Sequence, residues 1–428
     1  MEALLTVRAE PATAGPPAPG TRFSALDSWR GIAALLVALF HLDALGHFYG
    51  IAFLRNSHLF VDFFFVLSGF VISYSSYARL TDSRALLPFM IKRFGRVWPL
   101  HAVMLAAFVA FPLAEWTACD MTKICGTSWP LNPQRDNLGT YVSNLFLVQA
   151  LGIYDNMSWN WPSWSVSTEF WTYLFFAVTA ITFRALLVPL GMVIVAASAL
   201  VIFLFAPSYT AFSYSYLRCV VGFFSGFLIF RLYVSGRLPL WRFGTALEAL
   251  SVVLMIAFVS LVGTSNGAFA APLVFGLCVY VFAHESGWIS RLLTTAPFLK
   301  LGEWSYSIYM IHAFILIVIL RLVSAIEKVV GQPIRIDIGH PPKLYYYHDK
   351  YLMDAMALLY VVTVIAVARF AYHRLEAPAR DYFNGLAQSF SGSTDIRARK
   401  ASTEEAVTSL RNASLDAVEG RRGGHRES

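Results

Sequence analysis

Charged residues are scarce in this sequence. Only 14% of its 428 residues are Asp, Glu, Lys or Arg, whereas 57% are hydrophobic. A soluble globular protein usually carries about a quarter charged residues, so the composition excludes that class and indicates a membrane protein. The net charge of +7 does not require a nucleic-acid partner, because basic residues in membrane proteins usually mark cytoplasmic loops.

The two ends of the sequence lack long apolar runs. Residues 1–22 have no apolar core like that of a signal peptide and are rich in Pro, Ala and Gly, which predicts a disordered tail. Residues 386–428 are polar and charged and predict a second, cytoplasmic disordered tail. Apolar segments follow one another closely over residues 23–385, so we expect one transmembrane domain and no separate soluble domain.

Long apolar segments are abundant between the tails. A helix that crosses the ~30 Å hydrocarbon core needs about 20 apolar residues. The segments that approach this length are 28–47, 58–78, 97–114, 164–183, 185–206, 213–233, 244–262, 268–283, 303–323 and 352–372. They predict an all-α integral membrane protein with about ten transmembrane helices. The apolar segment 141–154 is too short to cross, and we expect it at the membrane interface.

The basic residues predict the orientation. They gather after the second, sixth, eighth and tenth predicted spans, in connections that all lie on one side if ten spans are right. Lys and Arg favour cytoplasmic loops, so this side is the cytoplasmic one and both termini lie there. The residues are Arg79, Arg84, Lys92, Arg93, Arg96, Arg231, Arg237, Arg242, Arg291, Lys300, Arg374 and Arg380.

Cysteine is also rare, with four residues in the chain. Cys119 and Cys125 fall in the longest predicted outer loop, residues 115–162, and are close enough to bridge. An oxidising compartment favours a disulfide there. Cys219 and Cys278 lie within predicted spans, where packing is the simpler explanation. Four zinc ligands are nowhere clustered, so we expect no metal.

Ionisable residues inside predicted spans are functional candidates, because lipid penalises them. They are Arg30, His41, Asp43, Glu169, Arg218, His312 and Arg321. At 1.5 Å per residue, His41 lies about 20 Å from the inner end of its span, Glu169 about 8 Å below the outer end, and His312 about 14 Å up. In a ~30 Å core these depths predict one polar chamber. Packing against a backbone carbonyl is the alternative for either histidine.

The residue types suggest a chemistry for this chamber. Histidine is the usual general base for a hydroxyl, and a carboxylate such as Glu169 can orient it. Arg30 lies about 16 Å nearer the cytoplasm than His41, which suits a long substrate with an anionic head and a reactive end. Arg93 and Arg96 share a helix face, and guanidinium groups match phosphate geometry. A purely topological role is the alternative for these two arginines.

Six stretches resemble, in order, the motifs of the membrane acyltransferase-3 family. They are "LDSWRGIAALLVALFH" with Arg30 and His41, "FFFVLSGFVI", "KRFGRVWPLH" with Arg93 and Arg96, "WSVSTEFWTYLFF" with Glu169, "LGEWSYSIYMIH" with Ser305, Tyr309 and His312, and "HRLEAPAR" with Glu376 and Pro378. Two positions depart from the usual pattern. Trp29 replaces an aliphatic residue and is expected to narrow the donor entrance, and Phe170 replaces a second glutamate.

The resemblance implies an O-acyltransferase in a plasma membrane, in particular a bacterial inner membrane. Acyl-CoA, in particular acetyl-CoA, would be the co-substrate, with no bound cofactor. Arg30, Arg93 and Arg96 would hold it, His41 would act as general base, and Glu169 would assist. The acceptor would be a hydroxyl of a glycan or glycosylated small molecule.

Two other classes of function stay open. A transporter or permease could use buried His, Glu and Arg as a proton or solute pathway, although no repeat relates the two halves of the sequence. A non-catalytic sensor or scaffold has no obvious use for these buried residues. Acceptor-dependent consumption of acetyl-CoA separates an enzyme from both alternatives.

Overall fold

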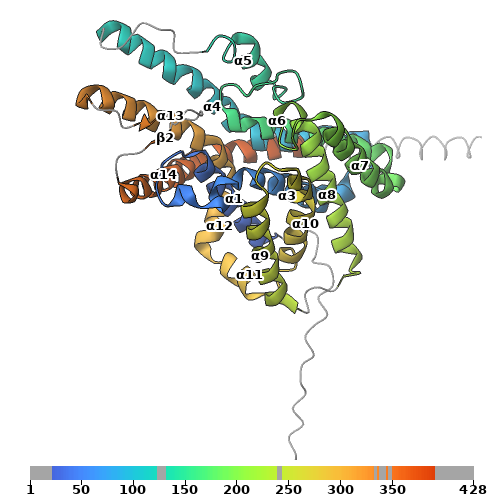
Figure 1. Ribbon diagram of the computed structural model, residues 1–428. Helices are drawn as coiled ribbons and strands as arrows, with labels where there is room; N and C mark the ends of the chain where they lie inside the picture. The colour runs from blue at the N-terminus through green and yellow to red at the C-terminus, as the bar shows by residue number, and fades with distance from the viewer. Residues whose placement is uncertain are drawn as a thin grey trace, which may run out of the picture.

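Helices occupy nearly all of the protein that the computed structural model describes, which is residues 22–122, 132–238, 243–331, 335–336, 344–345 and 349–390 (Figure 1). Helices occur at all ten predicted spans. They are α1 (Ser24–His41), α3 (Phe60–Ser76), α4 (Leu86–Thr122), α6 (Trp164–Thr182), α7 (Leu187–Phe205), α8 (Ser215–Ser235), α9 (Gly244–Val262), α10 (Ala271–Phe282), α13 (Ser305–Val330) and α14 (Lys350–Ala371). The predicted all-α membrane fold is confirmed.

Shorter elements connect these helices. The short helices are α2 (Ala52–Arg55), α5 (Leu138–Leu145), α11 (Trp288–Leu293) and α12 (Ala296–Glu303), and a small antiparallel pair joins β1 (Arg335–Ile336) to β2 (Leu344–Tyr345). The 3₁₀ turns are Phe48–Gly50, Ser57–Leu59, Tyr77–Arg79, Ser83–Ala85, Trp161–Ser163, Arg184–Leu186, Phe212–Tyr214 and Asn266–Ala270. The segment 141–154 contains only the second half of α5, followed by turns, so it is too short to cross a membrane, as expected.

Seven helical segments of the described chain are long and apolar enough to cross a membrane. They are Ser57–Arg79, Ser83–Ala118, Arg184–Phe205, Phe212–Ser235, Gly244–Val262, Ser305–Glu327 and Lys350–Phe390. α1 and α6 are less apolar because residues such as Arg30 and Glu169 interrupt them, and α10 is short. Ten crossings therefore stay a prediction, although a helix exists at each position.

Two predicted boundaries need correction. α4 begins at Leu86 and not near residue 97, so Lys92, Arg93 and Arg96 lie on a helix and not in a connection. The last helix continues beyond α14, through a π-helical turn (Tyr372–Glu376), as far as Phe390. This helix thus continues past residue 386, where we placed the start of the tail, and Ala387 within it is fully buried. Residues 1–21 and 391–428 lie outside the described part.

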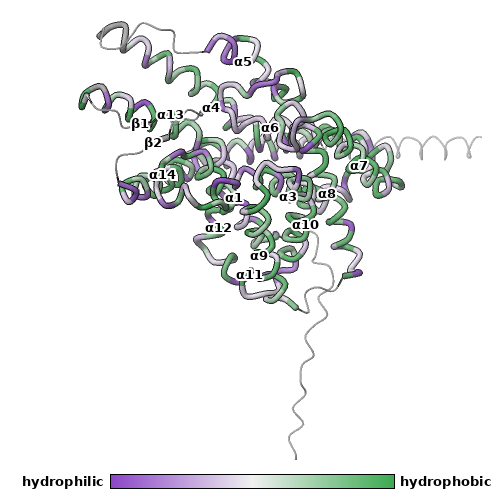
Figure 2. The backbone as a smooth tube through the Cα atoms, viewed as in Figure 1, coloured by the Kyte–Doolittle hydropathy of each residue, from purple (hydrophilic) through white to green (hydrophobic). Residues whose placement is uncertain are grey.

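α1 lies at the centre of the bundle, in contact with α3, α12 and α13 (Figure 1). Hydrophobic residues dominate the outer helices, including α7 and α9 (Figure 2). On α7, Leu200 and Phe203 expose more than half of their surface, as residues that face lipid do. The interior can therefore hold the polar residues that lipid excludes.

Glycine allows α3 and α8 to pack with their backbones in contact. A Cβ atom at Gly69 would overlap the carbonyl oxygen of Phe223, and one at Gly226 would overlap that of Val66. Small residues at helix crossings are typical of membrane proteins, because close approach increases van der Waals contact. The motif "FFFVLSGFVI" thus has a structural role at Gly69.

We predict that Gly69→Ala destabilises the protein, because the added methyl group must push α3 away from α8. Overpacking of this kind typically costs about 1–3 kcal/mol. Gly50→Ala is the matched control, since a Cβ atom at Gly50 has no neighbour within 4 Å. Thermal unfolding of the purified protein in detergent should show a lower midpoint for Gly69→Ala only. Equal midpoints for the two variants would contradict a tight α3–α8 contact.

Candidate active site

The start of α1 is anchored by hydrogen bonds to the α10–α12 region. The backbone N–H of Ala25 donates to Glu285 Oε1 over 2.8 Å, and Ser28 Oγ donates to the Leu293 carbonyl oxygen over 2.6 Å. Burial raises the pKa of the Glu285 carboxyl, and the bond from Ala25 opposes this shift by favouring the charged form. These contacts hold the end of α1 that carries Arg30.

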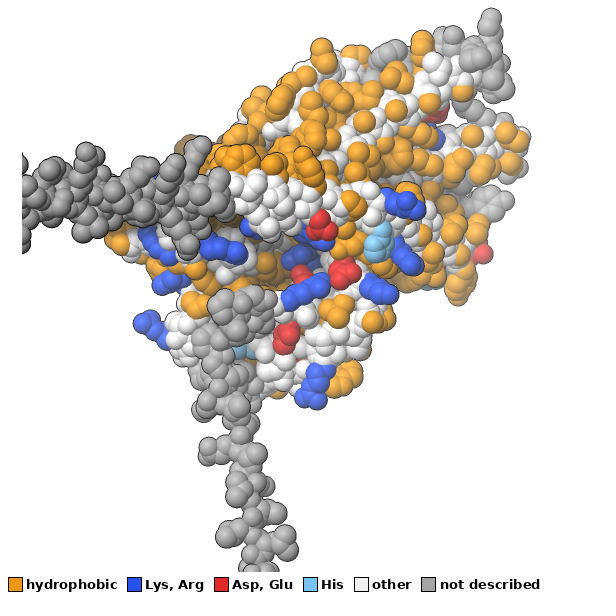
Figure 3. All heavy atoms as spheres, turned by 180° about the vertical axis from the view of Figure 1, so that it is seen from behind, with side chains coloured by type: hydrophobic (Ala, Val, Ile, Leu, Met, Phe, Trp, Pro, Cys, Tyr) orange, Lys and Arg blue, Asp and Glu red, His pale blue; other side chains and the backbone are white. Residues whose placement is uncertain are grey.

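A cavity of about 370 Å³, here called the inner cavity, lies at the basic end of the bundle, where α1 and α4 begin. Its charged lining residues are Asp27, Arg30, Lys92, Arg93, Arg96, Glu169 and Arg380, and its other polar lining residues are Ser68, Ser165, Tyr173, Ser305, Tyr306, Tyr309 and Asn384. The structure therefore brings together all three arginines that the sequence predicts to hold a donor. On the face drawn in Figure 3, charged side chains gather around a hollow beside a hydrophobic surface, in agreement with this charged lining.

Some polar groups of the inner cavity lack a partner in the described part of the chain. Arg93 Nε and Ser305 Oγ are buried atoms without a hydrogen bond, and Ser305 is only 2% exposed. Buried polar groups are nearly always hydrogen-bonded, so these atoms mark places where a ligand can accept a hydrogen bond. Arg30, in contrast, pairs with Asp27 at 3.3 Å.

Trp29 does not narrow this cavity, contrary to expectation. Its ring packs against Phe282 with 5.4 Å between centroids, and it is not among the residues that line the cavity. On a helix, the residue next to Arg30 points about 100° away from it, which explains why Trp29 faces α10 instead.

A second cavity of about 330 Å³, here called the outer cavity, lies at the opposite end of α1. Its polar and aromatic lining residues are Phe40, His41, Arg55, Asn56, His58, Trp161, Trp164, Thr210, Phe212, Ser215, Arg218, Thr264 and Tyr309. The eleven-residue separation of Arg30 and His41 thus places one residue in each cavity.

His41 is held by its backbone and by a second histidine. Its Nδ1 atom lies 2.9 Å from the Val37 carbonyl oxygen and 3.2 Å from Nε2 of the buried His312. A carbonyl can only accept, so the network assigns the proton to Nδ1 and leaves Nε2 of neutral His41 as a hydrogen-bond acceptor. The structure therefore brings His41 and His312 together, as the predicted chamber required.

Glu169 lies elsewhere. It lines the inner cavity, within electrostatic range of Arg30 and Arg93, whereas the hydrogen-bond partners of His41 are Val37 and His312. The structure therefore has two cavities in place of the single chamber that we expected. The carbonyl of Val37, and not Glu169, orients the ring of His41. The depth estimate could not show this, because it gives the level of a residue in the membrane but not the face of the helix bundle to which it belongs.

Arg55 is a site residue that the sequence analysis missed. It donates to the carbonyl oxygen of Phe40 over 3.0 Å, pairs with Asp43 at 3.2 Å, and lies 4.2 Å from the Tyr49 ring centroid. Phe40 is next to His41 at the end of α1, where a cation satisfies free carbonyls and the helix dipole. Arg55 lies outside the predicted spans, so its burial gave no signal in the sequence.

A buried ion pair lies beside the outer cavity. Arg218 donates to both carboxylate oxygens of Asp62, over 2.9 Å and 2.6 Å, and both side chains are nearly inaccessible. Arg218 was among the predicted buried charges, whereas Asp62 was overlooked in the apolar run "FVDFFF". The sequence did contain a signal for this pair, because one predicted span carries a single carboxylate and another carries a guanidinium group.

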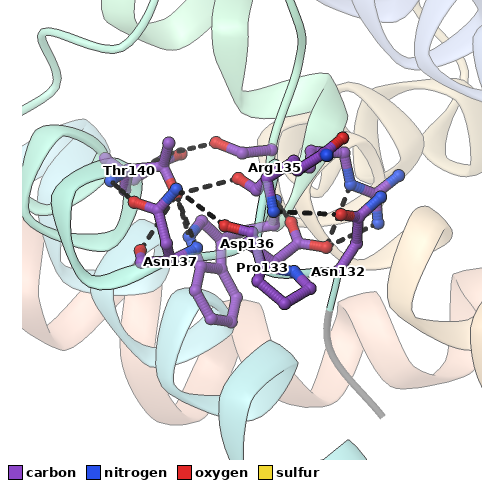
Figure 4. Close-up of polar contacts among 10 residues, drawn as sticks. Asn132, Pro133, Arg135, Asp136, Asn137 and Thr140 are labelled. Carbon is purple, nitrogen blue, oxygen red and sulfur yellow. Dashed lines mark hydrogen bonds and ion pairs between the residues drawn. The ribbon is translucent and has the colours of Figure 1, made fainter. Parts of the chain in front are cut away.

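The segment before α6 is fixed by a polar network (Figure 4). Asn137 and Thr140 form a capping box at the start of α5. Asp136 Oδ1 accepts from the backbone N–H of Trp159 over 2.9 Å, and Thr140 Oγ1 accepts from its indole N–H over 3.0 Å. Trp161, two residues later, lies with its ring 6.3 Å from that of His41, so the network positions one wall of the outer cavity.

The predicted Cys119–Cys125 disulfide falls outside the residues whose side chains the structure describes. Cys219 and Cys278 are free and buried, which agrees with a packing role. In the described part of the chain, three or more His, Cys, Asp or Glu residues nowhere gather as a metal site would require.

Comparisons with known proteins show which sequences this chain resembles. A family model described as an acyltransferase domain matches residues 23–373. "Acyltransferase MdmB" of Streptomyces mycarofaciens is 34% identical over 166 residues, which are 36% of this chain and 38% of that protein. "Protein 2 in picA locus" of Rhizobium radiobacter is 37% identical over 94 residues, which are 22% of this chain and 47% of that protein. The alignments thus cover less than half of either relative, and no solved structure matches.

We predict that Arg218→Ala destabilises the protein by about 3–5 kcal/mol, because it leaves the Asp62 carboxylate buried without its partner. Arg321→Ala is the matched control: it removes a guanidinium from an ion pair with Glu115 whose side chains are 47% and 35% exposed. Such surface pairs contribute about 1 kcal/mol or less. Chemical denaturation in mixed micelles measures both variants, and a similar small loss in each would contradict a structural role for the buried pair.

Proposed function

Because the chain belongs to the membrane acyltransferase-3 family, we propose that it is an O-acyltransferase that moves an acyl group from cytoplasmic acyl-CoA to a hydroxyl group on the outer side. The observation that supports this most is the position of two cavities at the two ends of one helix. α1 brings Arg30 to the inner cavity and His41 to the outer cavity. A donor and an acceptor that approach from opposite sides need such an arrangement.

The inner cavity suits the donor. Its lining has five basic residues, Arg30, Lys92, Arg93, Arg96 and Arg380, against two acidic ones, Asp27 and Glu169. Coenzyme A is rich in phosphate, and arginine binds phosphate through paired, charge-assisted hydrogen bonds. The cavity lies at the basic end of the bundle, which the positive-inside rule assigns to the cytoplasm, where acyl-CoA is present.

The unpartnered groups of this cavity fit the same ligand. Arg93 Nε and Ser305 Oγ supply hydrogen bonds that the described residues of the protein leave unused. Glu169 offsets part of the positive charge around Arg30 and Arg93, and so keeps the guanidinium groups in place when the cavity is empty. We propose acetyl-CoA as the physiological donor on the basis of the family resemblance.

The outer cavity suits a hydroxylated acceptor. Asn56, Thr210, Ser215 and Thr264 contribute amide or hydroxyl groups to its lining, and Trp161 contributes an aromatic face. Alternating hydroxyl and C–H groups of a sugar ring can bond to the former and pack on the latter. A glycan or glycosylated small molecule is therefore the proposed acceptor class.

His41 supplies the base. With Nδ1–H held by Val37, Nε2 takes the proton from the acceptor hydroxyl as its oxygen attacks the thioester carbonyl carbon. The carbon–sulfur bond then breaks, and the leaving thiolate takes the proton from the His41 imidazolium. The products are an ester of the acceptor and free coenzyme A. His312 lies against His41 and restricts the orientation of its ring.

We expect Arg93→Ala and Arg96→Ala each to weaken acetyl-CoA binding by about 10- to 100-fold. A hydrogen bond to a charged group contributes roughly 1.5–3 kcal/mol, and each variant removes at least one. Arg84→Ala is the control, because Arg84 lies on the same basic side but is exposed and absent from the cavity lining. Isothermal titration calorimetry in detergent gives the dissociation constants. Equal affinities for all three variants would mean that Arg93 and Arg96 only set the orientation of the protein in the membrane and do not bind the donor.

We expect His41→Ala to abolish acyl transfer while it leaves acetyl-CoA affinity unchanged. Loss of a general base typically lowers the rate about 10²–10⁴-fold. His47→Ala is the control, since His47 pairs with Asp354 outside both cavities. Mass spectrometry of surface and secreted glycans should show the mass of one acyl group in cells with the wild-type chain or His47→Ala, but not in cells with His41→Ala. Acylated glycans at normal levels with His41→Ala would disprove the role of His41.

A further inference from the structure

Tyr309 is the single residue shared by the two cavity linings, within the part of the chain that the structure describes. It lies on α13 and is 6% exposed. Every other described lining residue belongs to one cavity only. Tyr309 therefore lies at the boundary between the inner cavity and the outer cavity.

Hydrogen bonds join Tyr309 to both sides of the boundary. Its hydroxyl lies 2.9 Å from the carbonyl oxygen of Pro162, a residue of the outer cavity, and 2.8 Å from Oγ of Ser165, a residue of the inner cavity. Ser165 Oγ also lies 3.3 Å from the Pro162 carbonyl oxygen, which can only accept, so the two hydroxyl groups and the carbonyl form one hydrogen-bonded cluster. The hydroxyl thus connects the α13 side chain to the first turn of α6.

Aromatic contacts hold the ring of Tyr309 in place. Phe64, which lines the inner cavity, meets it edge-on with 5.8 Å between centroids, and the ring of His312 lies 5.7 Å away. The ring is thus fixed at both its edge and its hydroxyl. A side chain held in this way can act as a wall.

Chemistry explains why a wall is needed at this point. A general base such as His41 can remove a proton from water as well as from a sugar hydroxyl, and in the predicted topology the outer cavity faces the aqueous side. If water reached the thioester, its oxygen would attack the carbonyl carbon, the carbon–sulfur bond would break, and a carboxylic acid and free coenzyme A would result. Active sites that handle reactive groups prevent such side reactions by excluding water.

We propose that Tyr309, held by Ser165 and Pro162, is the partition across which the acyl group passes, and that it shields the thioester in the inner cavity from water in the outer cavity until an acceptor is bound. The inference rests on the proposed function for the identity of the donor. The partition itself rests on geometry alone and can be tested separately.

The first test measures release of coenzyme A from acetyl-CoA by the purified full-length protein without acceptor. Tyr309→Ala should raise this rate at least tenfold over wild type, and Tyr309→Phe, which keeps the ring but loses both hydrogen bonds, should fall between them. The double variant Tyr309→Ala/His41→Ala should lose the increase, because the leak uses His41 as base. A mere loss of structure would lower activity and would not depend on His41.

Tyr233→Ala is the matched control. Tyr233 is also buried and also donates to a backbone carbonyl, that of Ala283 over 3.3 Å, but it lines neither cavity. It should release coenzyme A at the wild-type rate. An equal increase in Tyr233→Ala, or an increase in Tyr309→Ala that persists without His41, would overturn the proposal.

The second test needs no enzymatic activity. Ser68→Cys places a thiol in the inner cavity of a chain in which Ser replaces Cys119 and Cys125. An impermeant methanethiosulfonate reagent added outside intact cells should leave this thiol unmodified, and Tyr309→Ala should make it reactive. Modification with Tyr309 intact would overturn the partition. The expected labelling with no acylated glycan in cells that carry the wild-type chain would keep the partition and refute the proposed acyl transfer.

Discussion

The rigidity of α1 is the constraint on which the rest of the structure depends. A helix rises 1.5 Å per residue, so the eleven residues from Arg30 to His41 fix a separation of about 16 Å. Lipid would reject both side chains, and the surrounding helices therefore enclose them. The contacts of Ala25 and Ser28 hold one end of the helix, and Arg55 holds the carbonyl of Phe40 at the other.

The two ends of this helix differ in chemistry. At the inner end, several guanidinium groups face a cavity that suits phosphate, and Arg93 Nε has no partner in the described part of the chain. At the outer end, the Nε2 acceptor of His41 faces hydroxyl, amide and aromatic groups. Tyr309 closes the space between them. The arrangement separates recognition of the donor from activation of the acceptor. An acyltransferase of the membrane acyltransferase-3 family needs both when its two substrates approach from opposite sides.

The sequence predicted the features that depend on a single helix. The positions of the ten helices at the predicted spans, the separation of Arg30 and His41, and the grouping of Arg93 with Arg96 all follow from periodicity and composition. Features that depend on which helices are neighbours were missed. The depth of Glu169 was compatible with His41, but α6 turns it toward the arginines. Asp62 was overlooked because its apolar neighbours suggested packing, and only the structure pairs it with Arg218.

The most direct test of the central claim is a cryo-electron microscopy structure of the protein with coenzyme A. The account predicts that the phosphates lie among Arg30, Arg93 and Arg96, and that the thiol end points along α1 toward Tyr309 and stops on its inner side. Coenzyme A bound in the outer cavity beside His41, or bound with its phosphates away from all three arginines, would contradict the assignment of the inner cavity to the donor.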